Sequence, residues 1–135
     1  IYLTGAVPSK KNSKQIFCRG RRPTVLPSPA HMRWHESLIE QLNGHPWQGR
    51  GEEKPLFLAI TLYDKKNKDG TLPRRTFDLT NKAESIMDAL VDYSFIRDDD
   101  YHTAHKVLLQ FGGFRPEQGA DIHIEVLEPG DIKML

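Results

Sequence analysis

Carboxylate side chains gather in two segments of the chain, and they carry the clearest indication of chemistry. The first segment holds Asp78, Glu84 and Asp88, of which the last two stand four residues apart and would repel each other on one helix face. The second is the triplet Asp98–Asp100, whose neighbouring charges raise the affinity of the group for protons or cations. Mg²⁺ prefers oxygen ligands of this kind, and two or three converging carboxylates suffice for it. These residue types favour a Mg²⁺ site, with Mn²⁺ as an alternative ion.

The same carboxylates also have a purely structural interpretation. Asp78 stands where the N-cap of a helix is expected, and a carboxylate there meets the positive end of the helix dipole. Glu84 and Asp88 fit a solvated helix face, and Asp98–Asp100 fits an acidic turn. Spacing alone leaves both interpretations open.

Other reactive side chains exclude several classes of chemistry. Cys18 is the only cysteine, so neither an intrachain disulfide nor a four-cysteine zinc site can form. His31 and His35 share a helical spacing but lack the His-Glu-x-x-His pattern of zinc proteases. We expect a partly exposed histidine pair on a helix, and we expect metal-activated water rather than a covalent nucleophile to carry any hydrolysis.

In the first half of the chain, a strand, a hairpin and a helix are expected. Residues 1–7 form a short apolar strand candidate, and residues 16–19 and 24–26 can pair as a hairpin. Ser28 followed by proline marks a helix start, and an apolar residue at every fourth position predicts a helix that ends near Gly44. Its apolar residues are Trp34, Leu38 and Leu42.

In the second half, a buried strand is followed by a helix and two further strands. The nearly continuous apolar run at residues 55–63 predicts a buried central strand. Residues 103–111 and 122–126 alternate as strands, separated by a turn or loop at Gly112-Gly113 and residues 116–119, and residues from 129 form a loose tail. The helix between them presents one apolar stripe, formed by Leu79, Ala83, Ile86, Met87 and Leu90. The order predicts an α+β fold, a single domain with a mixed β-sheet packed with helices on one side.

Length and composition set the class of protein. With 135 residues, 38% hydrophobic and 27% charged, the chain fits one globular domain and neither a disordered nor a membrane protein. No apolar run approaches the roughly 20 residues that span a bilayer, and residues 1–7 lack the basic flank and apolar stretch of a signal peptide. We expect a cytoplasmic protein that does not bind a membrane.

The net charge of +1 hides an uneven distribution. Residues 1–35 carry seven basic side chains and no acidic one, whereas the remaining residues carry 12 basic and 18 acidic side chains. We call residues 1–35 the basic front. Its position beside an acidic remainder of the chain suggests a polyanion-binding surface next to a site that needs carboxylates. The alternative is that these cations only solvate a hairpin.

Three blocks of sequence, in the same order as in the family pattern, resemble the RusA-like Holliday junction resolvases, a family of phage and prophage origin. The blocks are residues 75–81 (RTFDLTN), residues 86–90 (IMDAL) and residues 95–99 (FIRDD). They are similar to the family pattern of Asp-x-Asp-Asn after a basic loop, then Asp-x-Leu, then a hydrophobic pair that ends in Asp-Asp. Residues 7–13 (VPSKKNS) are similar to its Pro-x-x-x-Asn segment, and the resemblance extends over roughly residues 4–127.

This resemblance implies one RusA-like endonuclease domain over residues 1–135. It implies a Mg²⁺-dependent homodimer that resolves four-way DNA junctions by paired nicks during recombination or repair, in a bacterial host cell. Asp78 and Asp99 match the family's metal-binding aspartates. The candidate DNA-binding residues are Lys10, Lys11, Asn12, Lys14, Arg21, Arg22, Arg74 and Arg75.

Two positions depart from the family pattern. Thr80 stands where a second aspartate is expected, and Glu84 stands where many members have a lysine. We hypothesise that Glu84 replaces the missing carboxylate as a catalytic and metal-binding residue, while Lys10, Lys11 or Lys82 supplies positive charge near the phosphate. The departures leave two other functions open: a branched-DNA-binding protein of a mobile element that does not cut, and a flap or fork nuclease.

Overall fold

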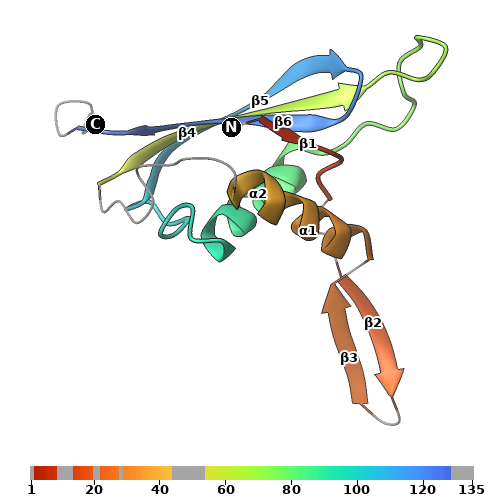
Figure 1. Ribbon diagram of the computed structural model, residues 1–135, viewed down its shortest axis with the longest axis horizontal. Helices are drawn as coiled ribbons and strands as arrows, with labels where there is room; N and C mark the ends of the chain where they lie inside the picture. The colour runs from red at the N-terminus through yellow and green to blue at the C-terminus, as the bar shows by residue number, and fades with distance from the viewer. Residues whose placement is uncertain (1, 9–13, 20–21, 28, 44–53, 129–135) are drawn as a thin grey trace.

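The computed structural model describes residues 2–8, 14–19, 22–27, 29–43 and 54–128. Their secondary structure follows the expected order of strand, hairpin, helix, strand, helix, strand, strand (Figure 1). The elements are β1 (Tyr2–Thr4), β2 (Lys14–Arg19), β3 (Arg22–Pro27), α1 (Pro29–Asn43), β4 (Leu56–Lys65), α2 (Leu79–Asp92), β5 (Ala104–Arg115) and β6 (Gly119–Val126).

Four of the strands form one mixed sheet in the order β1-β6-β4-β5. Strand β4 is central, as predicted, and it runs antiparallel to β6 and parallel to β5. Ile60 marks its middle, where it lies between Ile122 of β6 and Leu109 of β5. Both helices lie on the same side of this sheet (Figure 1). The predicted α+β class, a mixed sheet with helices on one side, is confirmed.

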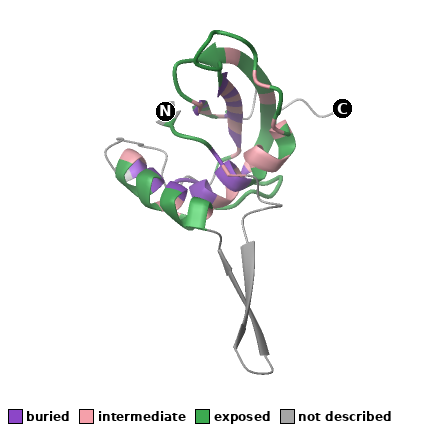
Figure 2. Ribbon diagram, turned by 90° about the vertical axis from the view of Figure 1, so that its right-hand side faces the viewer, coloured by how far each residue is buried: buried purple, intermediate pink, exposed green. Residues whose placement is uncertain are grey.

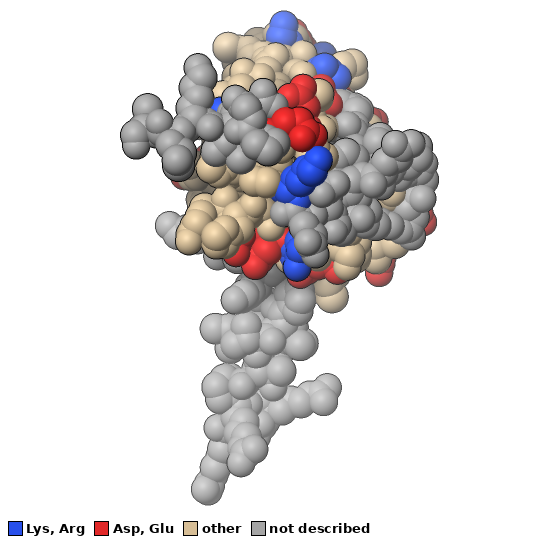
Figure 3. Space-filling model, turned by 90° about the vertical axis from the view of Figure 1, so that its left-hand side faces the viewer, with Lys and Arg blue, Asp and Glu red and all other residues tan. Residues whose placement is uncertain are grey.

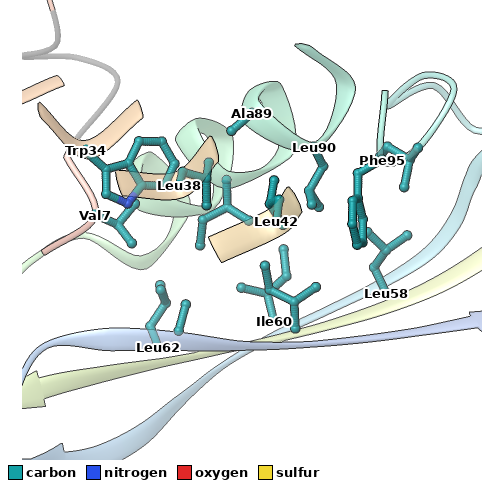
Figure 4. Close-up of a cluster of buried hydrophobic side chains, with 14 of the residues drawn as sticks. Val7, Trp34, Leu38, Leu42, Leu58, Ile60, Leu62, Ala89, Leu90 and Phe95 are labelled. Atoms are coloured by element: carbon teal, nitrogen blue, oxygen red, sulfur yellow. The ribbon is translucent and has the colours of Figure 1, made fainter. Parts of the chain in front are cut away.

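The hydrophobic core lies between this sheet and the helices. Every second residue of β4 is buried, and Leu58, Ile60 and Leu62 point toward the helices (Figure 4). Helix α1 contributes the predicted apolar residues, and α2 contributes Ile86 and Leu90. Burying each such side chain stabilises the fold by about 1.5–3 kcal/mol. The inner side of the elements is buried and the outer side exposed (Figure 2).

The opposite face of β4 is only half-buried, which the apolar run did not predict. Phe57 and Ala59 point away from the helices and keep partial exposure, because both helices cover the other face of the sheet. The strand is therefore central in the sheet without being buried on both faces.

Two predicted boundaries are wrong for reasons of backbone geometry. The first strand ends at Thr4 rather than at residue 7, because Gly5 adopts a φ of +103° and turns the chain. Gly112-Gly113 do not form a turn but lie inside β5, where a register shift makes room for an extra residue. A Cβ at Gly112 would collide with the Tyr63 ring, so this position accommodates the ring only as glycine.

The predicted hairpin is confirmed, and it extends away from the sheet and helices (Figure 1). Its strands β2 and β3 pair antiparallel, with Arg19 opposite Arg22 at the closed end. The cap expected at Ser28 and the tail expected from residue 129 lie outside the described residues. Neither α1 nor α2, the helices of the described residues, is long and apolar enough to cross a membrane.

Candidate active site

The start of α2 is built around the side chain of Asp78. Its Oδ1 accepts a hydrogen bond from the backbone N–H of Thr80 at 3.0 Å and another from the Thr80 hydroxyl at 2.7 Å. The backbone of Asp78 is extended, as an N-cap requires, and its carboxylate compensates unpaired N–H groups of the first turn. The structural interpretation of Asp78 as an N-cap is confirmed.

An open groove of about 400 Å³ lies between α2, the acidic turn that follows it and β5. Thr80, Glu84 and Asp88 share one face of α2, because they stand four residues apart. The groove is lined by Thr80, Ala83, Glu84, Met87, Asp88, Asp99 and Leu109. The structure thus brings together Glu84 and Asp99, two of the three predicted metal-binding residues, and it places Asp78 outside the lining.

The acidic turn explains why Asp99 is the carboxylate that reaches the groove. Asp98 Oδ1 accepts a hydrogen bond from the Asp99 N–H at 2.8 Å, within the turn itself. Asp100 Oδ1 accepts from the N–H groups of His102 and Thr103, both at 3.1 Å. The flanking carboxylates therefore hold the backbone of the turn, and the middle one faces the groove.

The surroundings of Asp99 disfavour its charged form. Partial burial raises the pKa of its carboxyl above the usual range, and a hydrogen bond with the Asp98 side chain raises it further. Repulsion from the charges of Asp98 and Asp88 acts in the same direction. A cation bound in the groove would reverse this balance by favouring the ionised carboxylate.

The donors of the groove fit a hard divalent cation. They are the oxygens of Thr80, Glu84, Asp88 and Asp99, and Mg²⁺ prefers such oxygen ligands to nitrogen or sulfur. No three His, Cys, Asp or Glu side chains among the described residues already stand in a metal-binding arrangement. These carboxylates would hold the ion only after their side chains rotate toward it.

Two side chains of α2 form hydrogen bonds to the backbone of Val7 and Pro8, which precede the first basic residues of the chain. The Ser85 hydroxyl donates a hydrogen bond to the backbone carbonyl of Pro8 at 2.7 Å, and Lys82 Nζ donates to the carbonyl of Val7. The Lys82 ammonium also lies 4.7 Å from the centre of the Phe77 ring. Lys82 is not among the groove-lining residues, so its contacts favour an anchoring role over contact with a phosphate in the groove.

The predicted DNA-binding residues are only partly described. Lys14 and Arg22 begin the two hairpin strands, and Arg74 and Arg75 are exposed in the segment before α2. The other four, Lys10, Lys11, Asn12 and Arg21, lie outside the described residues. On the face shown in Figure 3, described acidic and basic side chains are interspersed rather than separated into two fields.

No protein-family model matches the chain, and no curated protein matches it. The resemblance to the RusA-like family therefore stays a prediction from the sequence motifs.

Two residues that build this site are not among those predicted from the sequence as metal-binding. Asp88 lines the groove beside Glu84, and the i+4 spacing of the two residues is the signal that places them on one face of the helix. Ser85 gave no such signal, because a small polar residue beside buried Ile86 resembles an interruption of the apolar stripe.

The histidine pair lies apart from the groove. The ring centres of His31 and His35 on α1 are 4.3 Å apart, and both side chains are half-buried. His35 Nδ1 lies 2.9 Å from the hydroxyl of Tyr93, the C-cap of α2. The prediction of a partly exposed helical pair is confirmed.

Proposed function

We propose that this protein is a RusA-like, Mg²⁺-dependent endodeoxyribonuclease that resolves four-way DNA junctions by paired nicks. It acts as a homodimer in recombination or repair of a phage or prophage, in the cytoplasm of the bacterial host. One observation supports the proposal most. Glu84 and Asp88 of α2 and Asp99 of the following turn line one groove, although Asp99 comes from a separate segment.

The groove residues have distinct tasks in this chemistry. When bound, a Mg²⁺ ion would supply a polarised water and positive charge beside the phosphate. Glu84 and Asp99 would hold the ion, and Asp88 adds negative charge beside them. Asp78 acts indirectly, because it fixes the first turn of α2 and the hydroxyl of Thr80.

The basic front of the chain would bind the DNA backbone. Seven cations and no acid in residues 1–35 neutralise phosphates, which makes binding salt-dependent and largely independent of base sequence. The anchors at Val7 and Pro8 fix to α2 the end of the segment that precedes Lys10, Lys11 and Asn12. The helix that carries Glu84 and Asp88 therefore also fixes the origin of the DNA-binding segment.

A second function is favoured by the departures at the start of α2. Thr80 stands where the family pattern has a carboxylate, and Asp78 is engaged as an N-cap outside the groove lining, so neither of these two positions supplies a carboxylate to the groove. These features suit a protein that holds branched DNA without cutting it.

A synthetic mobile four-way junction, incubated with and without Mg²⁺, distinguishes the two functions. We expect nicks in two opposed strands with Mg²⁺ and binding without nicks in EDTA. Forks, flaps and linear duplex of matched length show whether the junction is preferred. Binding without Mg²⁺-stimulated nicking of any of these substrates would favour the second function.

Variants of the groove then test the assignment of residues. Glu84→Gln and Asp99→Asn should each lower the nicking rate by about 100-fold or more, because each removes a charged ligand of the metal. Asp92→Asn is the matched control, since Asp92 is an exposed aspartate of α2 outside the groove lining. Full activity of either groove variant would remove that residue from the site.

Asp78→Asn separates capping from metal binding. Asparagine caps helices about as well as aspartate, so this variant keeps α2 while it removes the negative charge. We expect a smaller loss of nicking than in Asp99→Asn, because Asp78 does not line the groove. An equal or larger loss of nicking would show that Asp78 binds the metal.

A further inference from the structure

Strand β5 forms a long edge of the sheet, and no other described strand pairs with its outer side. Long edges invite pairing with another chain, and proteins usually shield them with charge, proline, bulges or a covering segment. In β5 two bulges flank one regular stretch. His105 and Gly112 are the extra residues where its register with β4 shifts.

The stretch between these bulges is regular and apolar. From Lys106 to Phe111 each residue pairs one-to-one with β4, and no charged residue follows Lys106 in this stretch. Val107, Leu108 and Phe111 are exposed to 46–47%, although aliphatic and aromatic side chains of a sheet are usually covered. We call residues 106–112 the edge window.

We propose that the edge window pairs antiparallel with the edge window of a second copy of this chain, about a two-fold axis at Leu109. A two-fold axis that relates antiparallel neighbours passes through a residue position, so the register must be centred on one residue. Centring on Leu109 uses the entire edge window and places Val107 opposite Phe111.

Charge favours this register over its neighbours. With the axis at Leu109, Lys106 lies opposite Gly112 and Leu108 lies opposite Gln110, so no like charges face each other. With the axis at Gln110, His105 would face Arg115, and a protonated histidine there would be repelled. With the axis at Leu108, Phe111 would face His105 and lose its apolar partner.

An apolar hollow beside the edge window suits the same partner. Its volume is about 310 Å³, and Phe111 and Phe114 of β5 line it together with Leu72, Pro73 and Phe77. The ring centres of Phe111 and Phe114 are 5.5 Å apart. In the proposed register, Val107 of the second copy lies against Phe111 at this hollow, which buries apolar surface on both sides.

The pairing would join the two sheets into one with all four helices on one face. Leu109 lies at the axis and also lines the acidic groove, so the two grooves open on either side of the axis. This step rests on the proposed function: two symmetric nicks need two active sites on one face.

Sedimentation velocity of the full chain at micromolar concentration tests the interface without reference to cleavage. We expect a dimer for the wild type and at least about tenfold weaker self-association for Leu108→Lys, because a charged lysine of each copy would then lie in the edge window, where charge disfavours strand pairing. Met32→Lys is the matched control, since Met32 is an α1 side chain exposed to 44% against 46% for Leu108. A monomeric wild type, or a Leu108→Lys dimer of undiminished affinity, overturns the proposal.

Disulfide cross-linking tests the register without introducing a charge. In a Cys18→Ser background, Leu108→Cys and Gln110→Cys should cross-link when mixed, because opposite residues lie within reach of a disulfide. Neither should cross-link by itself, since identical positions would be offset along the strands. Strong cross-linking of either variant alone contradicts an axis at Leu109.

The measurements of self-association and the nicking assay test separate claims, and either can fail without the other. A dimer that cross-links as expected but does not nick junctions keeps the interface and removes the nuclease function. A monomeric protein that nicks junctions does the reverse.

Discussion

The two neighbours of β4 differ in what covers them. Along β6, Ala120 and Ile122 are buried to within 1% of full burial, whereas Val107 and Phe111 on the helix side of β5 remain nearly half exposed. Both strands pair with β4 over most of its length, so backbone hydrogen bonding does not explain the difference. Helix α2 contacts β5 at Leu109 but leaves Val107 and Phe111 exposed, beside the acidic groove and the apolar edge. Stability therefore resides mainly on one side of β4, and the features suited to binding lie on the other.

Truncating one side chain on each strand tests this difference in packing most directly. Ile122→Ala should lower the free energy of unfolding by about 3 kcal/mol, since it leaves a cavity in a closed core. Val107→Ala should cost less than about 1 kcal/mol, because Val107 already contacts water. Urea denaturation in a Leu108→Lys background measures both without a contribution from self-association. Equal losses would show that β5 is as well packed as β6.

A smaller effect is expected from a polar contact on the covered side of α2. Ser85→Ala should lower the free energy of unfolding by about 1–3 kcal/mol, because it leaves the Pro8 carbonyl without its hydroxyl partner. It should also weaken DNA binding, since the anchor of the basic segment is lost. Denaturation and junction binding in EDTA measure the two effects. Unchanged binding would show that the anchor does not position that segment.

The smallest expected effect is electrostatic and lies on the groove side. The pKa of Asp99 is raised in the folded protein, so its contribution to stability is present below about pH 3.9 and is lost as the pH rises through the folded pKa. Asp99→Asn mimics the protonated form, and its stability should exceed that of the wild type increasingly as the pH rises above about 3.9 and through the raised pKa of the folded protein.

Denaturation midpoints measured across these pH values test that expectation. In the proposed metal site, Mg²⁺ would favour the ionised carboxylate of the wild type, so adding it should reduce the difference in stability between the variant and the wild type. A difference that is constant with pH would contradict the assigned repulsion.

Periodic features of the fold were predictable from the sequence. Trp34, Leu38 and Leu42 recur every four residues, and all three are buried as one stripe of α1. Alternation likewise predicted β6, where Ile122 is buried between exposed Asp121 and His123. These predictions are correct because the spacing of apolar residues along one helix or strand determines which side chains face the core.

Features that depend on distant partners were not predictable. The turn propensity of Gly112-Gly113 is overridden by the Tyr63 ring on the neighbouring strand, which is far away in sequence. The apolar run of β4 cannot reveal that only one face is covered by helices. In the groove, chemistry and family resemblance predicted Glu84 and Asp99 together, but the contact between Ser85 and Pro8 depends on tertiary packing alone.

The pairing of β1 with β6 also constrains how the chain folds during synthesis. Tyr2 lies opposite Asp121, so the first described strand has no place in the sheet until the last one has been made. At about 5–20 residues per second, that interval lasts several seconds. The β4–β6 pairing, which closes the core, is delayed in the same way. The ribosome therefore completes nearly the entire described chain before the sheet can close, and β1 cannot belong to an early folding nucleus.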